Sequence, residues 1–196
     1  MRLVDFREGA WLNPPASQDL QAASVTVVTD AKTDFWRETH YGFVRDTGHF
    51  LAFEAGQAFT AEVRVRAGYQ ALYDQAGLMI RSGSDLWVKC GVEYTDGRAA
   101  LSTVLTRNQS DWSVTEASHD LRDVRIRATL KDGALRIQAS VDGSTWPMLR
   151  LAPFDPGSNP VFVGPMCCTP ERAGLRVDFT ELRIGPPREA GLHDLS

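Results

Sequence analysis

The chain has 196 residues, of which 43% are hydrophobic and 23% charged, a composition that suits one sizeable globular core and excludes a disordered chain. The net charge of −4 is mixed in sign along the sequence and forms no basic stripe, so nucleic acid is not an expected partner. No window reaches the roughly 20 apolar residues of a membrane span, and the N-terminus has no signal-peptide pattern. With three cysteines that form no even disulfide framework, we expect a cytoplasmic protein without a membrane partner.

The first fifty residues combine turn chemistry with aromatic side chains. Pro14 and Pro15 favour extended backbone outside a sheet ladder, so Trp11 is expected to anchor a loop on the core. Residues 25–28 are a β-branched run that predicts a short strand. Residues 29–50 show neither a helical nor a strand period, and we predict a functional loop there.

A clear period of two follows in residues 50–114. Asp96-Gly97 predicts a tight hairpin between two alternating runs. A two-residue turn at this point places Glu93 opposite Ala100 and Lys89 opposite Val104. Lys89 and Glu93 are four residues apart and therefore share one face of their strand.

The rest of the chain continues the strand pattern, with further Asp-Gly turns at 132–133 and 142–143. Further strands are predicted at residues 124–130, 134–141, 146–151, 161–163 and 174–184. About a dozen strands and no helix predict an all-β fold, a two-sheet antiparallel β-sandwich or jelly roll. We expect one domain at 1–185 and a loose polar tail at 186–196.

A binding site is predicted on the polar face of the central strands, with aromatic loop residues as its walls, because sugars and other flat ligands stack on aromatic rings. The predicted ligand-binding residues are Trp36, Tyr41, Asp74, Gln75, Lys89, Glu93 and Trp112. The competing interpretation is that Lys89 and Glu93 form a surface ion pair while the aromatic residues plug one end of the core.

Other chemistry has weaker support. His40 and His49 share a loop with Asp34 and Asp46 but lack metal-ligand spacing, and no cofactor or metal is expected. No serine lies in a nucleophile elbow, and no glycine loop would hold a phosphate.

Several blocks of the sequence resemble a known family over about Trp11 to Ile184. These blocks are WLNPP (11–15), TDFWRETHYGFVRDTGHF (33–50), LYDQAGLMIR (72–81), LWVKCGVEY (86–94), SDWSV (110–114) and VGPMC (163–167). The family is domain of unknown function 1349, and the resemblance implies a concanavalin A-like lectin/glucanase sandwich. It also implies a candidate metabolic-enzyme partner, since a fungal member is linked to the regulation of enolase. It carries no set of catalytic residues.

Three functions remain open at this point. The first is a non-enzymatic module that binds a small carbohydrate or polar metabolite on its concave sheet face. The second is a regulatory protein-interaction domain that acts on a metabolic enzyme such as enolase. The third is a glycoside hydrolase or lyase that uses Asp74 and Glu93 as paired carboxylates.

Overall fold

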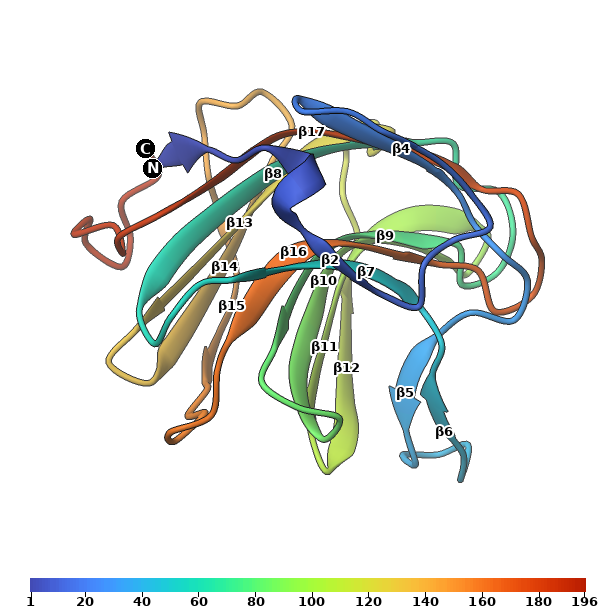
Figure 1. Ribbon diagram of the computed structural model, residues 1–196, viewed down its shortest axis with the longest axis horizontal. Coiled ribbons are helices and arrows are strands. Elements are labelled where there is room, and N and C mark those ends of the chain that lie inside the picture. The colour runs from blue at the N-terminus through green and yellow to red at the C-terminus, as the bar shows by residue number, and fades with distance from the viewer.

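Strands dominate the computed structural model, which describes residues 1–196, and they form two stacked sheets (Figure 1). There are 17 strands and one short 3₁₀ turn, η1 (Phe6–Glu8). All strand pairs are antiparallel, so the predicted all-β two-sheet sandwich is confirmed. None of the helical structure has the length and hydropathy that a membrane-spanning helix requires.

The two sheets share the strands almost equally. The eight-stranded sheet runs β15 (Met148–Pro153), β14 (Ala134–Ser140), β13 (Asp123–Lys131), β8 (Phe59–Ala67), β17 (Arg176–Gly185), β4 (Ser24–Val28), β3 (Ser17–Leu20), with β1 (Arg2–Leu3) also paired to β17. The seven-stranded sheet runs β12 (Gln109–Thr115), β11 (Arg98–Arg107), β10 (Leu86–Thr95), β9 (Gln75–Arg81), β16 (Phe162–Cys168), β7 (His49–Glu54), β2 (Ala10–Leu12).

The main core lies between the inner faces of these sheets. Alternate residues of each strand point inward, such as Val88, Cys90 and Val92 of β10, because successive side chains of a strand face opposite sides. The inward residues join one cluster of 36 buried hydrophobic side chains. The odd-numbered residues of β10 are left on the outer face of the seven-stranded sheet, where the polar side chains lie.

The register of the central hairpin matches the prediction. Glu93 pairs with Ala100 and Lys89 with Val104, because the turn at Asp96-Gly97 contains two residues. Asp96 has a φ of 51° and Gly97 a φ of 78°, the left-handed conformations that this tight turn requires.

Residues 29–50, predicted to be a loop, contain a short hairpin of β5 (Phe35–Arg37) and β6 (Val44–Asp46). Figure 1 shows this hairpin extending beside the seven-stranded sheet. Trp36 and seven other buried side chains form a second hydrophobic cluster between the hairpin and the outer face of that sheet. The outer face is therefore partly covered, and the hairpin forms one wall of a recess.

One other expectation was wrong. The short strand predicted at 161–163 is longer in the structure, where β16 continues to Cys168. The strand can pass through Pro165, which has no N–H to donate, because the pairing of β16 with β7 skips Gly164 and Pro165. The tail at 186–196 contacts the rest of the chain, since Arg136 Nη1 donates to the carbonyl of Gly191 at 2.9 Å and Trp146 N donates to that of Leu195 at 2.9 Å. Its looseness stays a prediction.

Candidate functional site

A cavity of about 210 Å³ opens on the outer face of the seven-stranded sheet, beneath the β5–β6 hairpin. Its floor comes from β9 and β10, and its walls come from the hairpin, β12 and the loops that precede β9 and follow β16. The lining residues are Asp34, Trp36, Tyr41, Phe43, Tyr73, Gln75, Lys89, Glu93, Trp112, Pro170 and Glu171. Six of the seven predicted residues line this cavity, and Asp74 does not.

Asp74 lies on the other side of the backbone from Gln75, as neighbouring residues of an extended chain must. Its side chain is fully buried and pairs with Arg172, whose Nε lies 2.9 Å from Oδ1. The backbone N–H groups of Gln70 and Ala71 donate to Oδ2 at 2.9 and 3.1 Å. Every oxygen of Asp74 is thus engaged in holding the loop before β9, and the pair of Asp74 and Glu93 does not form a catalytic dyad in one cleft.

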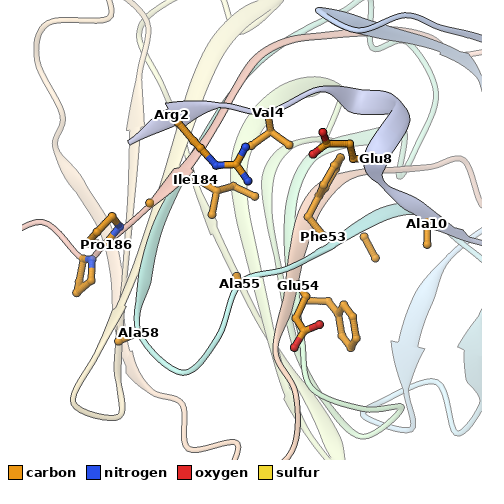
Figure 2. A pocket seen from close by; sticks show the side chains of 14 residues that line it. Arg2, Val4, Glu8, Ala10, Phe53, Glu54, Ala55, Ala58, Ile184 and Pro186 are labelled. Carbon is orange, nitrogen blue, oxygen red and sulfur yellow. The ribbon is translucent and has the colours of Figure 1, made fainter.

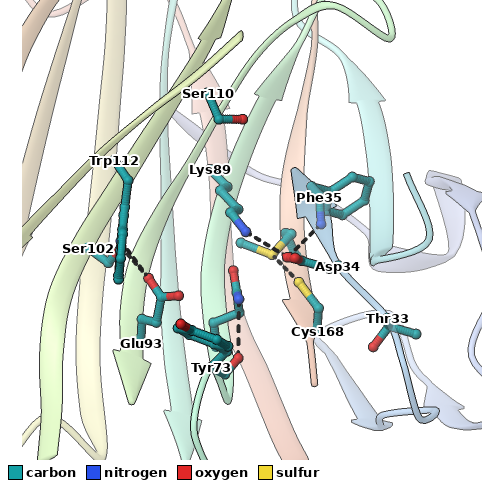
Figure 3. A network of polar contacts seen from close by, with 12 residues as sticks. Thr33, Asp34, Phe35, Tyr73, Lys89, Glu93, Ser102, Ser110, Trp112 and Cys168 are labelled. Atoms are coloured by element: carbon teal, nitrogen blue, oxygen red, sulfur yellow. Dashed lines mark hydrogen bonds and ion pairs between the residues drawn. The ribbon is translucent and has the colours of Figure 1, made fainter. Parts of the chain in front are cut away.

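Lys89 is buried, with 4% of its surface exposed, and it does not pair with Glu93. Its Nζ lies 2.9 Å from Oδ1 of Asp34, which comes from the segment that leads into β5 (Figure 3). Burial acts to lower the pKa of Lys89, but the negative charges of Asp34 and Glu93 outweigh it and raise the pKa above 10.5. Lys89 is therefore a charged donor in the cavity, and the competing interpretation of a surface ion pair between Lys89 and Glu93 is wrong.

Glu93 is also buried, with 5% of its surface exposed. Its Oε2 accepts hydrogen bonds from Ser102 Oγ at 2.6 Å and from Trp112 Nε1 at 3.0 Å, while Oε1 has no protein partner (Figure 3). Burial raises the pKa of Glu93, and the nearby charge of Lys89 reduces this shift without cancelling it. One oxygen of Glu93 is therefore held in place and the other is free for a ligand.

We expect Glu93 to cost stability at neutral pH. The folded-state pKa of Glu93 is raised above 4.5, so the folded protein binds the carboxyl proton of Glu93 more tightly than the unfolded chain does. The loss of folding stability caused by ionising Glu93 therefore grows as pH rises from the unfolded-state pKa to the folded-state pKa. Glu93→Gln should therefore be more stable than the wild type near pH 7.5, by about 1.4 kcal/mol for each unit of pKa shift. Urea unfolding checks this, and the advantage should shrink as pH falls towards the unfolded value. An advantage independent of pH would contradict the shift.

Two tyrosines close the rim of the cavity. The hydroxyl groups of Tyr41 and Tyr73 lie 2.8 Å apart, and this hydrogen bond raises the pKa of Tyr73 to about 12. The two hydroxyl groups bond to each other across the opening. Tyr41 belongs to the β5–β6 hairpin and Tyr73 to the loop before β9. The rim therefore joins the hairpin to the sheet through a polar contact that a ligand can approach.

Further contacts fix the hairpin over the sheet. Arg81 of β9 forms a two-pronged ion pair with Asp46 of β6, with both nitrogen–oxygen distances at 2.8 Å. Arg37 N donates to Ser110 Oγ of β12 at 2.9 Å. Asn13 of the WLNPP block donates to the carbonyl groups of Asp46 and Gly48, both at 2.9 Å. The walls of the cavity are thus positioned from three sides.

Sequence reasoning missed five of the lining residues. They are Asp34, Phe43, Tyr73, Pro170 and Glu171. Tyr73 had a usable signal, because it lies two residues before Gln75 and so shares its side of the chain. For Asp34 the only signal in the sequence was that it lies two residues before Trp36. No local sequence pattern indicates that Pro170 and Glu171, which follow β16, line the cavity.

The histidines have structural roles or lie outside the cavity. His49 is buried, and its Nδ1 lies 2.8 Å from the carbonyl oxygen of Asn13 while its Nε2 accepts from Asp30 N at 3.1 Å. His40 packs edge-on against Tyr41 with ring centroids 4.9 Å apart. Neither residue is among those that line the cavity.

A larger hollow of about 650 Å³ lies between the N-terminal segment, β7 and the end of β17 (Figure 2). It contains three charged side chains, Arg2, Glu8 and Glu54, but no ion pair joins them. Much of its lining is alanine and proline, and no buried polar group converges on its centre. The smaller cavity, with its buried charges and aromatic walls, is the better candidate for a specific site.

Comparisons with known proteins place the chain among its relatives. Residues 11–187 match the family described as "Protein of unknown function (DUF1349)". Regulation of enolase protein 1 from Saccharomyces cerevisiae is 54% identical over 193 residues, which cover 98% of this chain and 97% of that protein. The chain belongs to the DUF1349 family. The resemblance inferred from the sequence blocks is confirmed.

Solved structures agree with the fold of this DUF1349 protein. A protein of unknown function from S. cerevisiae superposes with a TM-score of 0.91 at 53% identity, covering 94% of this chain and 99% of that one. A glycoside hydrolase family 43 protein from Bacillus licheniformis superposes with a TM-score of 0.70 at 16% identity, over 93% of this chain but 38% of that one. Xylan β-1,4-xylosidase from Bacillus halodurans gives a TM-score of 0.68 at 15% identity, over 93% and 38%. At such identities the two bacterial likenesses establish the sandwich fold alone.

Proposed function

We propose that this DUF1349 protein is a cytoplasmic, non-enzymatic module that binds one small polar molecule, such as a carbohydrate or a related metabolite, in the cavity beneath the β5–β6 hairpin. The observation that carries the proposal is the free Oε1 of Glu93, an oxygen without a protein partner on a largely buried residue that lines the cavity. A carboxylate oxygen that no protein group pairs with can accept a charge-assisted hydrogen bond from a ligand, which is stronger than a bond between neutral groups.

The rest of the cavity supports this function. Lys89 uses one of its three N–H donors on Asp34, and Gln75 donates to the carbonyl of Tyr73 at 3.1 Å, which leaves its amide oxygen free. Free donors and acceptors thus lie on the floor, while aromatic rings form the walls, the arrangement that suits a ligand with both polar and apolar faces. The hydrolase alternative loses support because Asp74 is engaged elsewhere.

The size of the cavity limits the ligand. Its volume of about 210 Å³ is below the roughly 300–1,000 Å³ of pockets for drug-sized molecules. A ligand of about the size of one sugar ring fits this space, whereas a longer oligosaccharide would have to extend past Tyr41 and Tyr73 at the rim.

A thermal-shift screen against monosaccharides, polyols, amines and glycolytic metabolites tests the proposal. A ligand at a hundred times its dissociation constant adds about 2.7 kcal/mol, which for a chain of this length raises the Tm by about 5–10 °C. We expect the shift to disappear in Glu93→Ala and in Trp112→Ala, because these side chains hold the floor and one wall.

The matched control for this screen is Glu54→Ala, which removes an exposed carboxylate from another part of the same sheet. It should keep the full shift. Ligand-induced shifts that persist unchanged in both cavity variants would place the binding site elsewhere and contradict the proposal.

A regulatory role towards a metabolic enzyme is the second candidate, and the observation that favours it is the name of the yeast relative, regulation of enolase protein 1, at 54% identity over nearly the full length. The two functions are separable with purified enolase as bait. Enolase captured equally by the wild type and by Glu93→Ala would support an interaction surface apart from the cavity. No capture would remove direct contact with enolase from consideration.

A further inference from the structure

Four aromatic side chains of the cavity form a closed box. The ring of Trp36 stands nearly perpendicular to those of Tyr41 and Trp112, with interplanar angles of 74° and 89° and centroid distances of 5.6 and 6.4 Å. Tyr73 meets Trp112 at 75° and 6.3 Å, and the hydroxyl of Tyr73 bonds to that of Tyr41 at 2.8 Å. Each of the four residues therefore contacts the next, and the circuit returns to its start.

One corner of this box carries the buried carboxylate. Trp112 Nε1 donates to Glu93 Oε2 at 3.0 Å, and Figure 3 shows Glu93 between Trp112 and Tyr73. Lys89 lies four residues along the same strand, and its Nζ is directed to Asp34. The one positive charge of the cavity is thus ion-paired with Asp34, although it also acts on the carboxyl group of Glu93.

The charges that line the cavity are predominantly negative. Asp34, Glu93 and Glu171 supply three carboxyl groups, and Lys89 is the one basic residue among the lining side chains. Lys89 forms its ion pair with Asp34, so neither Glu93 nor Glu171 has an ion-pair partner among the lining residues, although the charge of Lys89 still acts on Glu93. A phosphate or carboxylate group in this space would face like charges, and burial would strengthen their repulsion.

We infer that the ligand of this cavity is a small cation, and that its alkylated or primary ammonium group occupies the aromatic box beside Glu93. The inference rests on the proposed function, since it names the ligand class for the same site. Aromatic faces attract an ammonium group more strongly than a neutral one, most of all where water is excluded. The cation also supplies the partner that Glu93 Oε1 lacks and neutralises the negative charge of the carboxylate. A sugar hydroxyl would supply a hydrogen bond but would leave that charge in place.

Choline and 3,3-dimethyl-1-butanol are the matched probes, because they share one shape and differ in the positive charge. Titration calorimetry at low salt and neutral pH should show choline binding at least about tenfold more tightly, which corresponds to about 1.4 kcal/mol. Glucosamine and glucose give the same comparison on a sugar ring. Glucose 6-phosphate should bind more weakly than glucose.

Variants separate charge from shape. Glu93→Gln keeps the size of the side chain and removes its charge. The affinity for choline should therefore fall about tenfold, while the affinity for 3,3-dimethyl-1-butanol should not change. Glu54→Gln should change neither. Equal affinity for choline and the neutral probe, or a preference for sugars or sugar phosphates that depends on Glu93, would overturn the cationic ligand and leave the proposed binding function standing. Absence of binding by every probe and every member of the ligand screen would overturn both.

Discussion

Asp34→Ala is expected to lower the free energy of unfolding by about 3–5 kcal/mol, because it leaves a buried ammonium group without its partner. Lys89 Nζ has no other hydrogen bond from the protein, and its side chain is 5% exposed. The substitution also removes the acceptor that holds Phe35 N at 2.8 Å at the start of β5. Urea unfolding measures the loss, and the corresponding fall in Tm is about 10 °C.

A double variant isolates the charge effect. Asp34→Asn keeps an acceptor for Phe35 N but still leaves Lys89 unpaired, so it should be destabilised as well. Adding Lys89→Met removes the buried charge, and stability should return to within about 1 kcal/mol of the wild type. Glu189→Ala, which breaks an exposed pair with Lys131, is the control and should cost less than about 1 kcal/mol. A stable Asp34→Asn single variant would show that Lys89 finds another partner or water.

Gly77→Ala and Gly91→Ala are each expected to cost about 3 kcal/mol or more. The two glycines face one another across β9 and β10. A methyl group on Gly77 would overlap the backbone oxygen of Cys90, and one on Gly91 would overlap that of Ala76. These neighbours are backbone atoms of central strands, so relief requires the strands to separate rather than a side chain to rotate.

This separation should also reach the cavity, because the same two strands carry Gln75, Lys89 and Glu93. Ligand binding should weaken in any Gly77 or Gly91 variant that still folds. Gly68→Ala is the matched control, since a methyl group there meets no atom within 4 Å, and its free energy of unfolding should change by less than about 0.5 kcal/mol. If Gly77→Ala had the same free energy of unfolding as the wild type, β9 and β10 would have separated without loss of stability, and the prediction would be wrong.

Most of the floor of the cavity was predictable because it depends on local alternation. Gln75, Lys89 and Glu93 were assigned to one face by the period of two along their strands, and they do share that face. Asp74 was included in the predicted site although its position is out of phase with Gln75. The structure places it on Arg172, an interaction across 98 residues that no periodicity reports.

The walls were harder to predict because they depend on how a distant segment folds back. Trp36 and Tyr41 were singled out by residue type alone, since residues 29–50 show no regular period. The β5–β6 hairpin that presents them is fixed by the ion pair of Asp46 with Arg81, by Asn13 and by the bond of Arg37 to Ser110. These contacts join parts of the chain that are 33 to 73 residues apart.

Three features could be predicted from residues close together in the chain: the antiparallel strands, the side chains that face inward, and the register of the hairpin at Asp96-Gly97. Alternation and turn chemistry act between near neighbours, so they are visible in the sequence. The pairing of Lys89 with Asp34 rather than Glu93 is a contact across 55 residues, and it depends on how the whole chain folds. The closure of four aromatic rings into one box depends on the same folding. Burial and pairing depend on which surfaces meet when the sheets stack, and this choice follows from the packing of the whole chain.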